Sequence, residues 1–136
     1  MTREQKDLLL KDLCSRLNTN LVCSIYRVDD YGVGYRDEIL SGYCKGDIWY
    51  EFYFGEDCGI CIDNVSKIKP YLFPLESMTE EQDKEFALLQ TSAGQEGFLY
   101  AWNCANMLKW LIENHFDING LIPKGLANDA TGKNIY

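Results

Sequence analysis

The sequence has little of what membrane-spanning or exported proteins need. It contains no run of 18 apolar residues, so no segment is long enough to cross a bilayer as a helix. The opening stretch MTREQKDLLLKD is rich in charge and lacks the apolar core of a signal peptide. We therefore expect a cytoplasmic protein that makes no membrane contact.

Basic residues are few and scattered along the chain. The 136 residues include 13 Lys and Arg against 21 Asp and Glu, a formal net charge of −8. Lys67 and Lys69 lie close together, but the acidic stretch 76–85 follows them. Because a nucleic-acid duplex carries dense negative charge, this balance argues against DNA or RNA as the partner. An acidic surface can serve solubility alone; the alternative is that it docks a basic partner or mimics DNA.

Histidine occurs once, as His115, so a hydrolytic triad or histidine acid–base chemistry would depend on this residue. It lies at the C-terminal end of a predicted helix, where the helix dipole favours a cation. A ring in that position can also bond the last carbonyl groups of the helix. No nucleophile in a strand-to-helix elbow can be tied to it. We expect no catalytic residue and no cofactor.

The sequence contains six cysteines. Without an export signal they are expected to be reduced thiols. Cys58-Gly59-Ile60-Cys61 has the spacing of a metal or redox pair. Zinc usually needs a second such pair, however, and redox chemistry favours a helix N-terminus. Cys23 and Cys44 lie singly in predicted strands, so plain thiols are favoured, with a metal or redox role for Cys58 and Cys61 left as the alternative.

Three segments have the pattern of amphipathic helices. Thr2-x-x-Gln5 and Thr79-x-x-Gln82 are capping boxes, which predict helices over residues 3–17 and 79–90. A broad apolar stripe predicts the third helix, over residues 98–116, and places Trp102 centrally in that stripe. We therefore expect Trp102 to be a core residue.

Four segments rich in β-branched and aromatic residues, separated by short glycine turns, predict strands. They cover residues 21–28, 33–44, 48–54 and 59–65. Such closely spaced strands leave no room for crossover helices, so the sheet is an antiparallel meander or a small, partly closed barrel. The predicted fold is α+β: a single domain over residues 1–127, with helices 3–17 and 98–116 packed together on the sheet. Residues 128–136 are expected to form a flexible tail.

Alternation within residues 48–54 assigns their side chains to two faces of the sheet. The better core face holds Ile48, Tyr50, Phe52 and Phe54. The other face mixes aromatic and acidic side chains, which suits the docking of a protein partner. With residues of neighbouring strands, this predicted partner-binding face comprises Trp49, Glu51, Tyr53, Tyr26 and Tyr43. The alternative is that the helices cover it.

Several motifs resemble those of an uncharacterised protein family. They are Lys69-Pro70-Tyr71-Leu72-Phe73-Pro74, Ser77-Met78-Thr79-Glu80-Glu81, His115-Phe116-Asp117, the stretch GLIPKGLA at 120–127, and the opening residues 1–9. That family is carried by phages, prophages and mobile elements of Bacteroides-type gut bacteria. Its members often have Arg where this chain has Phe73 and His where it has Asn114. The resemblance implies a mobile-element accessory protein and brings no activity with it.

Together these features predict a non-enzymatic accessory protein of a phage or mobile element that binds an unidentified protein partner. The alternative is a small enzyme or a thiol or metal-binding protein that uses Cys58, Cys61 or His115.

Overall fold

The computed structural model describes residues 1–29, 32–45, 50–55, 60–62, 64–91 and 98–136. The helices in these residues are α1 (Arg3–Ser15), α2 (Glu80–Thr91) and α3 (Phe98–Glu113), with two short 3-10 helices, η2 (Val65–Lys67) and η3 (Leu75–Ser77). The strands are β1 (Val22–Asp29), β2 (Gly32–Lys45), β3 (Tyr50–Phe54), β4 (Ile60–Ile62), β5 (Ile68–Leu72) and β6 (Asn128–Asp129). The predicted α+β class is confirmed.

The strands form one open sheet in the order β4-β3-β2-β1-β5-β6. Strands β1 to β4 pair antiparallel with their sequence neighbours, as the meander predicts. The predicted four-stranded arrangement is nevertheless wrong, because β5 pairs antiparallel with β1 and β6 pairs parallel with β5. Pro70 made β5 look like a connector, since proline has no N–H to give to a sheet. In the structure Pro70 lies opposite Cys23 of β1, one residue ahead of the pairing with β6.

The hydrophobic core lies between α1 and one face of this sheet. The first capping box is present: the Gln5 amide donates to the Thr2 hydroxyl, and the Thr2 amide donates to the Gln5 side chain. It starts α1 so that Leu9 and Leu13 point at the sheet and are fully buried. The buried core also includes Cys23, Ile25, Leu40, Phe52, Phe54, Ile68, Leu72 and Leu121. The predicted core face is therefore confirmed for Phe52 and Phe54; Ile48 lies outside the described residues.

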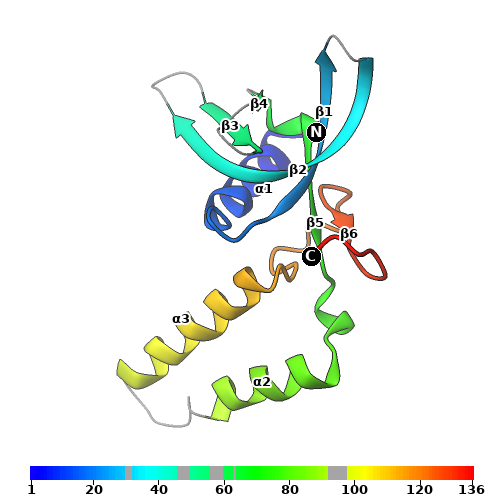
Figure 1. Cartoon of the computed structure of the whole chain (residues 1–136). Coiled ribbons are helices and arrows are strands. Elements are labelled where there is room, and N and C mark those ends of the chain that lie inside the picture. Colours follow the sequence, from blue (N-terminus) through cyan, green and yellow to red (C-terminus); the bar gives the residue numbers. More distant parts are fainter. Residues whose placement is uncertain (30–31, 46–49, 56–59, 63, 92–97) are drawn as a thin grey trace.

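Helices α2 and α3 lie side by side and project from the part of the molecule made by α1 and the sheet (Figure 1). We call this helix pair the arm and the remainder the body. The second capping box starts α2 as predicted, with the Gln82 amide donating to the Thr79 hydroxyl. The prediction that the helix at 98–116 packs along the sheet beside the N-terminal helix is wrong. Only the C-terminal end of α3 reaches the body, so Trp102 is 60% exposed and is not a core residue.

The last nine residues return to the body instead of leaving it as the expected tail. The Ala130 amide donates to the Leu72 carbonyl at 2.9 Å, and Ala130 is fully buried. The Tyr136 hydroxyl donates to the Tyr71 carbonyl at 2.7 Å and accepts from the Val22 amide at 3.3 Å. Hydrogen bonds and β6 together hold this segment against β5. The sequence pattern missed them because the segment is polar and its partners are distant in sequence.

Candidate docking surface

The predicted partner-binding face is assembled only in part. Trp49 lies outside the described residues. Glu51 and Tyr53 of β3 do share one face, and the Tyr53 hydroxyl donates to the Glu51 carboxylate at 3.1 Å. Both side chains are half-buried. This pair is the part of the predicted face that the structure brings together.

Tyr43 and Tyr26 do not join that pair. Tyr43 lies directly opposite Phe52, with ring centroids 5.0 Å apart, and therefore points to the core side of the sheet. Tyr26 packs edge-on against Tyr35 at 5.2 Å, near the far end of the β1–β2 ribbon. Tyr35 and Gly42, the β2 partners of Tyr26 and Tyr53, lie about 20 Å apart along the strand. The pairing of β2 with β1 and β3 thus places Tyr26 and Tyr53 far apart along the sheet, although the sequence predicted one binding face for both.

The cysteines give no assembled metal site in the part of the chain that the structure describes. Cys58 lies outside that part, and Cys61 belongs to β4, where it pairs with Tyr53. Cys23 is fully buried, and burial raises the pKa of its thiol. Cys44 lies on β2 well beyond the residue that pairs with Cys23, so the two thiols do not approach each other.

His115 is a packed residue rather than a cationic helix end. Its ring stacks on Tyr136 with centroids 4.0 Å apart, and only 7% of the residue is exposed. Burial, with a smaller effect from the nearby Arg16 guanidinium, lowers the pKa of His115 to about 4. The ring is therefore neutral near pH 7, and its buried Nδ1 atom has no hydrogen-bond partner. The ring is therefore not the cation that the dipole of a helix end favours.

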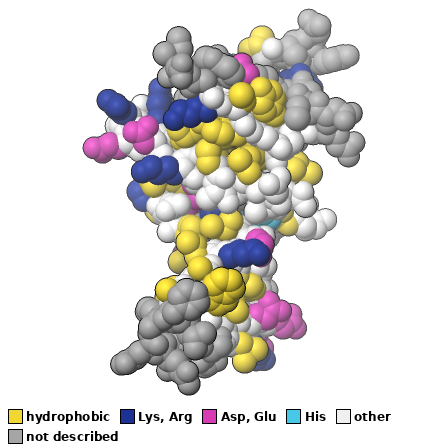
Figure 2. Space-filling view, turned by 90° about the vertical axis from the view of Figure 1, so that its left-hand side faces the viewer, with side chains coloured by type: hydrophobic (Ala, Val, Ile, Leu, Met, Phe, Trp, Pro, Cys, Tyr) yellow, Lys and Arg dark blue, Asp and Glu magenta, His cyan; other side chains and the backbone are white. Residues whose placement is uncertain are grey.

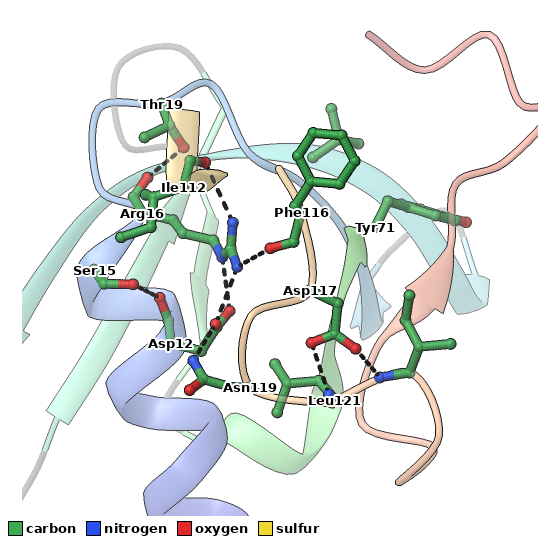
Figure 3. Close-up of polar contacts among 12 residues, drawn as sticks. Asp12, Ser15, Arg16, Thr19, Tyr71, Ile112, Phe116, Asp117, Asn119 and Leu121 are labelled. Atoms are coloured by element: carbon green, nitrogen blue, oxygen red, sulfur yellow. Dashed lines mark hydrogen bonds and ion pairs between the residues drawn. The ribbon is translucent and has the colours of Figure 1, made fainter. Parts of the chain in front are cut away.

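A buried ion pair anchors the arm to the body (Figure 3). Arg16, fully buried at the end of α1, bonds Asp12 at 2.8 Å. Its guanidinium also donates to the carbonyls of Phe116, at 2.7 Å, and Ile112, at 3.3 Å, where α3 ends. The Asn119 amide donates to the same Asp12 carboxylate. Sequence reasoning missed this cluster, because the i, i+4 spacing of Asp12 and Arg16 is equally typical of an exposed helical pair.

The side of α3 that faces away from α2 carries an apolar stripe that the described residues leave uncovered. At 100° per residue, its members fall within an arc of about 120°. None of them is buried, and Leu108 is 47% exposed. We call them the α3 stripe: Ala101, Trp102, Ala105, Leu108, Lys109 and Ile112.

The opposite side of α3 makes the contacts with α2, and this explains why the stripe remains exposed. Trp110 packs against Phe86 of α2, with ring centroids 5.5 Å apart, and stacks on Phe116 at 5.8 Å. The helix thus uses one side for its neighbour in the arm. In Figure 2 hydrophobic side chains continue from the body down onto the arm, and acidic side chains gather along one edge of the arm.

The C-terminal half of the stripe borders a hollow of about 400 Å³ between α3 and the end of α1. Leu108 and Ile112 line one wall, and Leu17 and Thr19 line the other. Lys109, which pairs with Glu113 at 3.7 Å, lies at its rim. The exposed side chain of Trp102 and this hollow therefore both belong to the α3 stripe.

No family model, curated protein or solved structure matches the chain. Among the described residues, no helix is long and apolar enough to span a membrane.

Proposed function

We propose that this chain is a non-enzymatic protein-binding accessory protein of a phage or mobile element, acting in the bacterial cytoplasm through the α3 stripe. The observation that carries the proposal is the exposure of Trp102 and Leu108 in a helix whose sequence is patterned for burial. Apolar helical faces of this kind occur where a helix lies against another protein surface.

The energetics favour a protein partner for this stripe. Burial of a large apolar side chain stabilises a contact by about 1.5–3 kcal/mol. Tryptophan is also enriched among the few residues that dominate protein interfaces. Trp102 and Leu108 together thus offer a strong anchor that the isolated chain leaves unused.

Nucleic acid is not the proposed partner. The chain carries a net charge of −8, and Glu80, Glu81 and Asp83 cluster in the first turn of α2 on the same arm. A polyanion would be repelled by a chain of this net charge. The family resemblance of the motifs around Lys69–Pro74 and 120–127 supports the assignment to a mobile element.

The enzyme alternative finds less support. His115 is neutral and stacked on Tyr136, away from the α3 stripe. A second hollow, of about 350 Å³, includes Asp117 and Asp129 in its lining. Both oxygens of Asp117 accept backbone amides, from Leu121 and Ile122 at 2.8 Å. That carboxylate therefore stabilises the turn at 117–122, and its hydrogen bonds to the backbone leave it less available to a substrate.

Affinity capture with matched variants tests the proposed function. The bait is the tagged full chain, incubated with lysate of bacteria that also express the untagged chain. Ala105→Glu puts a charge in the stripe, whereas Ala87→Glu puts the same charge on an exposed position of α2. We expect wild type and Ala87→Glu to capture the same protein and Ala105→Glu to lose it. Equal capture by both variants would contradict the proposal.

A further inference from the structure

Residues 128–136 return across the junction between the arm and the body, and we call them the strap (Figure 1). The last of them, Tyr136, stacks on the ring of His115 at the end of α3. We propose that the strap is a proton-sensitive latch, which closes over the neutral ring of His115 and is released when that ring takes up a proton. The inference concerns the base of the arm and does not depend on what binds the α3 stripe.

Backbone pairing and the Tyr136 side chain hold the strap closed. Residues 128–129 pair with β5 as β6, and the Ala130 amide donates to the Leu72 carbonyl at 2.9 Å. The Tyr136 hydroxyl donates to a β5 carbonyl at 2.7 Å, and its ring lies nearly parallel to that of His115, with centroids 4.0 Å apart. Histidine is the side chain that titrates near neutral pH, so the stack is the contact through which a proton can act on the strap.

His115 occupies an unfavourable position in this junction. Only 7% of the residue is exposed, and its buried Nδ1 atom has no hydrogen-bond partner in the part of the chain that the structure describes. Its φ of 60° lies in the left-handed region, which few residues other than glycine adopt. Contacts on both sides hold it there, because its amide donates to the Ile112 carbonyl and its carbonyl accepts from the Phe73 amide. A strained backbone and an unpaired polar atom at one residue are typical of a switch region.

A proton on this ring favours the open strap. Both ring nitrogens of an imidazolium are donors, so the buried Nδ1 atom would become part of a cation without an acceptor or water. The face of Tyr136 attracts a cation, but this attraction is small beside the hydration that the ring has lost. Removal of the Tyr136 ring from the stack admits water to His115. The protonated ring is therefore more stable when the strap is open.

The charged groups around His115 add to this preference. Burial, and to a smaller extent the Arg16 guanidinium of α1, lower the pKa of His115 to about 4. The carboxylate of Asp12 is already bound to Arg16 at 2.8 Å. Asp117, two residues beyond the ring, accepts two backbone amides of the following turn. A proton on His115 thus meets a cation, while these two acids are engaged by other partners.

Other titratable groups of the junction do not change charge as the pH falls from 7 to 5. Burial raises the pKa of three neutral groups, which therefore stay protonated: Tyr136, Tyr71 of β5 and Cys23 of β1. Hydrogen bonds within the strap lower the pKa of Asp129, which therefore stays charged. Glu113 of α3 pairs with Lys109 at 3.7 Å, and Lys133 of the strap lies over the Tyr71 ring at 5.1 Å. His115 is thus the group through which pH acts on the strap.

Proton binding and strap closure must affect each other reciprocally. If a proton on His115 opens the strap, then loss of the strap contacts must raise the pKa of His115. Each pH unit by which that pKa rises corresponds to a tenfold weaker closure over the protonated ring. The chain has one histidine, so its ring signals in an NMR spectrum need no further assignment.

An NMR titration of the purified full chain, from about pH 8 to about pH 3.5, tests the latch. It follows the His115 ring together with the amides of Ala130 in the strap and Leu13 in α1, both of which are fully buried. As the pH falls, the Ala130 amide should lose its protection from exchange with water at the midpoint of the ring titration. The Leu13 amide should remain protected at that pH, because the body stays folded.

Two tyrosine variants provide the reciprocal test. Tyr136→Ala should raise the pKa of His115 by at least about one pH unit, which is a tenfold effect on closure. Tyr35→Ala removes a tyrosine of β2 that is 63% exposed, and it should leave the pKa of His115 unchanged. If circular dichroism shows that Tyr136→Ala does not fold, Tyr136→Phe replaces it. That variant keeps the stacked ring and loses two hydrogen bonds, so the pKa of His115 should rise by less.

Any of three results would refute the latch. The first is a pKa of His115 that is the same in the wild type and in the Tyr136 variant. The second is an Ala130 amide that stays protected while the ring titrates, since the strap would then be closed over the charged ring. The third is loss of protection at Leu13 together with Ala130, because the chain would then be unfolding as a whole.

Discussion

Arg16 shows how much of this structure depends on single residues. It is a fully buried cation that joins α1 to the carbonyl end of α3. A guanidinium suits the position, because its forked donors serve Asp12 and two backbone carbonyls at once. The four unpaired carbonyls that end any helix need such partners when they are buried. For α3, a side chain about a hundred residues earlier in sequence supplies the donors.

Replacement of this residue should be costly. In Arg16→Ala the buried Asp12 carboxylate loses its counterion and the end of α3 loses its donors, so the free energy of unfolding should fall by about 3–5 kcal/mol. Urea denaturation monitored by circular dichroism measures this loss. Lys11→Ala, an exposed position in the same helix, should change it by less than about 0.5 kcal/mol. A similar small effect for both variants would show that the ion pair is not the anchor.

His115 predicts a pH dependence of stability. The pKa of this histidine is about 4 in the folded chain, below its ordinary value of 6.5. Between these values the unfolded chain binds more protons than the folded one, so stability is full above about pH 6.5 and falls as the pH drops toward 4. The total loss is about 3 kcal/mol. Denaturant titrations at several pH values measure it.

The His115→Asn variant is the matched control for this effect. Residue 115 has a φ of 60°, a left-handed conformation that asparagine tolerates better than most residues. Asparagine does not titrate, and the chain has one histidine. The slope of stability between pH 5 and 6.5 should therefore disappear in His115→Asn. A wild type whose stability is constant over this range would contradict the buried, neutral ring.

Among the elements, α3 differs most from its expected role. An isolated pair of helices gains little stability from propensity alone, and most helices are held by packing of an apolar face. In α3, one side packs on α2 through Phe86 and Trp110, and the α3 stripe has no cover within this chain. The arm therefore has an unsatisfied apolar side that an association can bury.

Trp102 and Phe52 distinguish an exposed helix face from the core. Trp102→Ala should lower the free energy of unfolding of the dilute, monomeric chain by less than about 1 kcal/mol, because its side chain is largely in water. Phe52→Ala, at a fully buried position, should cost about 3–5 kcal/mol. Urea titrations at low protein concentration compare the two. A loss for Trp102→Ala as large as that for Phe52→Ala would place α3 against the body.

The whole molecule consists of a body with its own core and an arm that shares little of it (Figure 1). The two are joined at the Arg16 cluster, and also at Phe73, whose amide donates to the His115 carbonyl at 2.9 Å. Tyr136 reinforces this junction by packing against both His115 and Phe73. The C-terminal residue of the described chain thus helps to hold the base of the arm.

Local sequence signals predicted the elements well. Thr2 and Thr79 mark helix starts because a capping box needs only residues three apart. Alternation placed Phe52 and Phe54 in the core, since the pleat of one strand determines which side chains share a face. The same reasoning paired Glu51 with Tyr53. It failed for Tyr43, whose face depends on the register and bulge of β2 against β3.

The sequence by itself determined the α+β class, the helix starts, the first four strands and the acidic charge, because each depends on neighbouring residues or on composition alone. Only the tertiary structure decided that residues 68–72 and 128–129 join the sheet, and that Arg16 meets the end of α3. It also decided that Trp102 faces solvent. An apolar stripe in the sequence predicts that one side of a helix is buried. The orientation of that helix relative to the rest of the molecule, however, depends on contacts between residues far apart in sequence. In this chain those contacts hold α3 at one end and leave its stripe exposed.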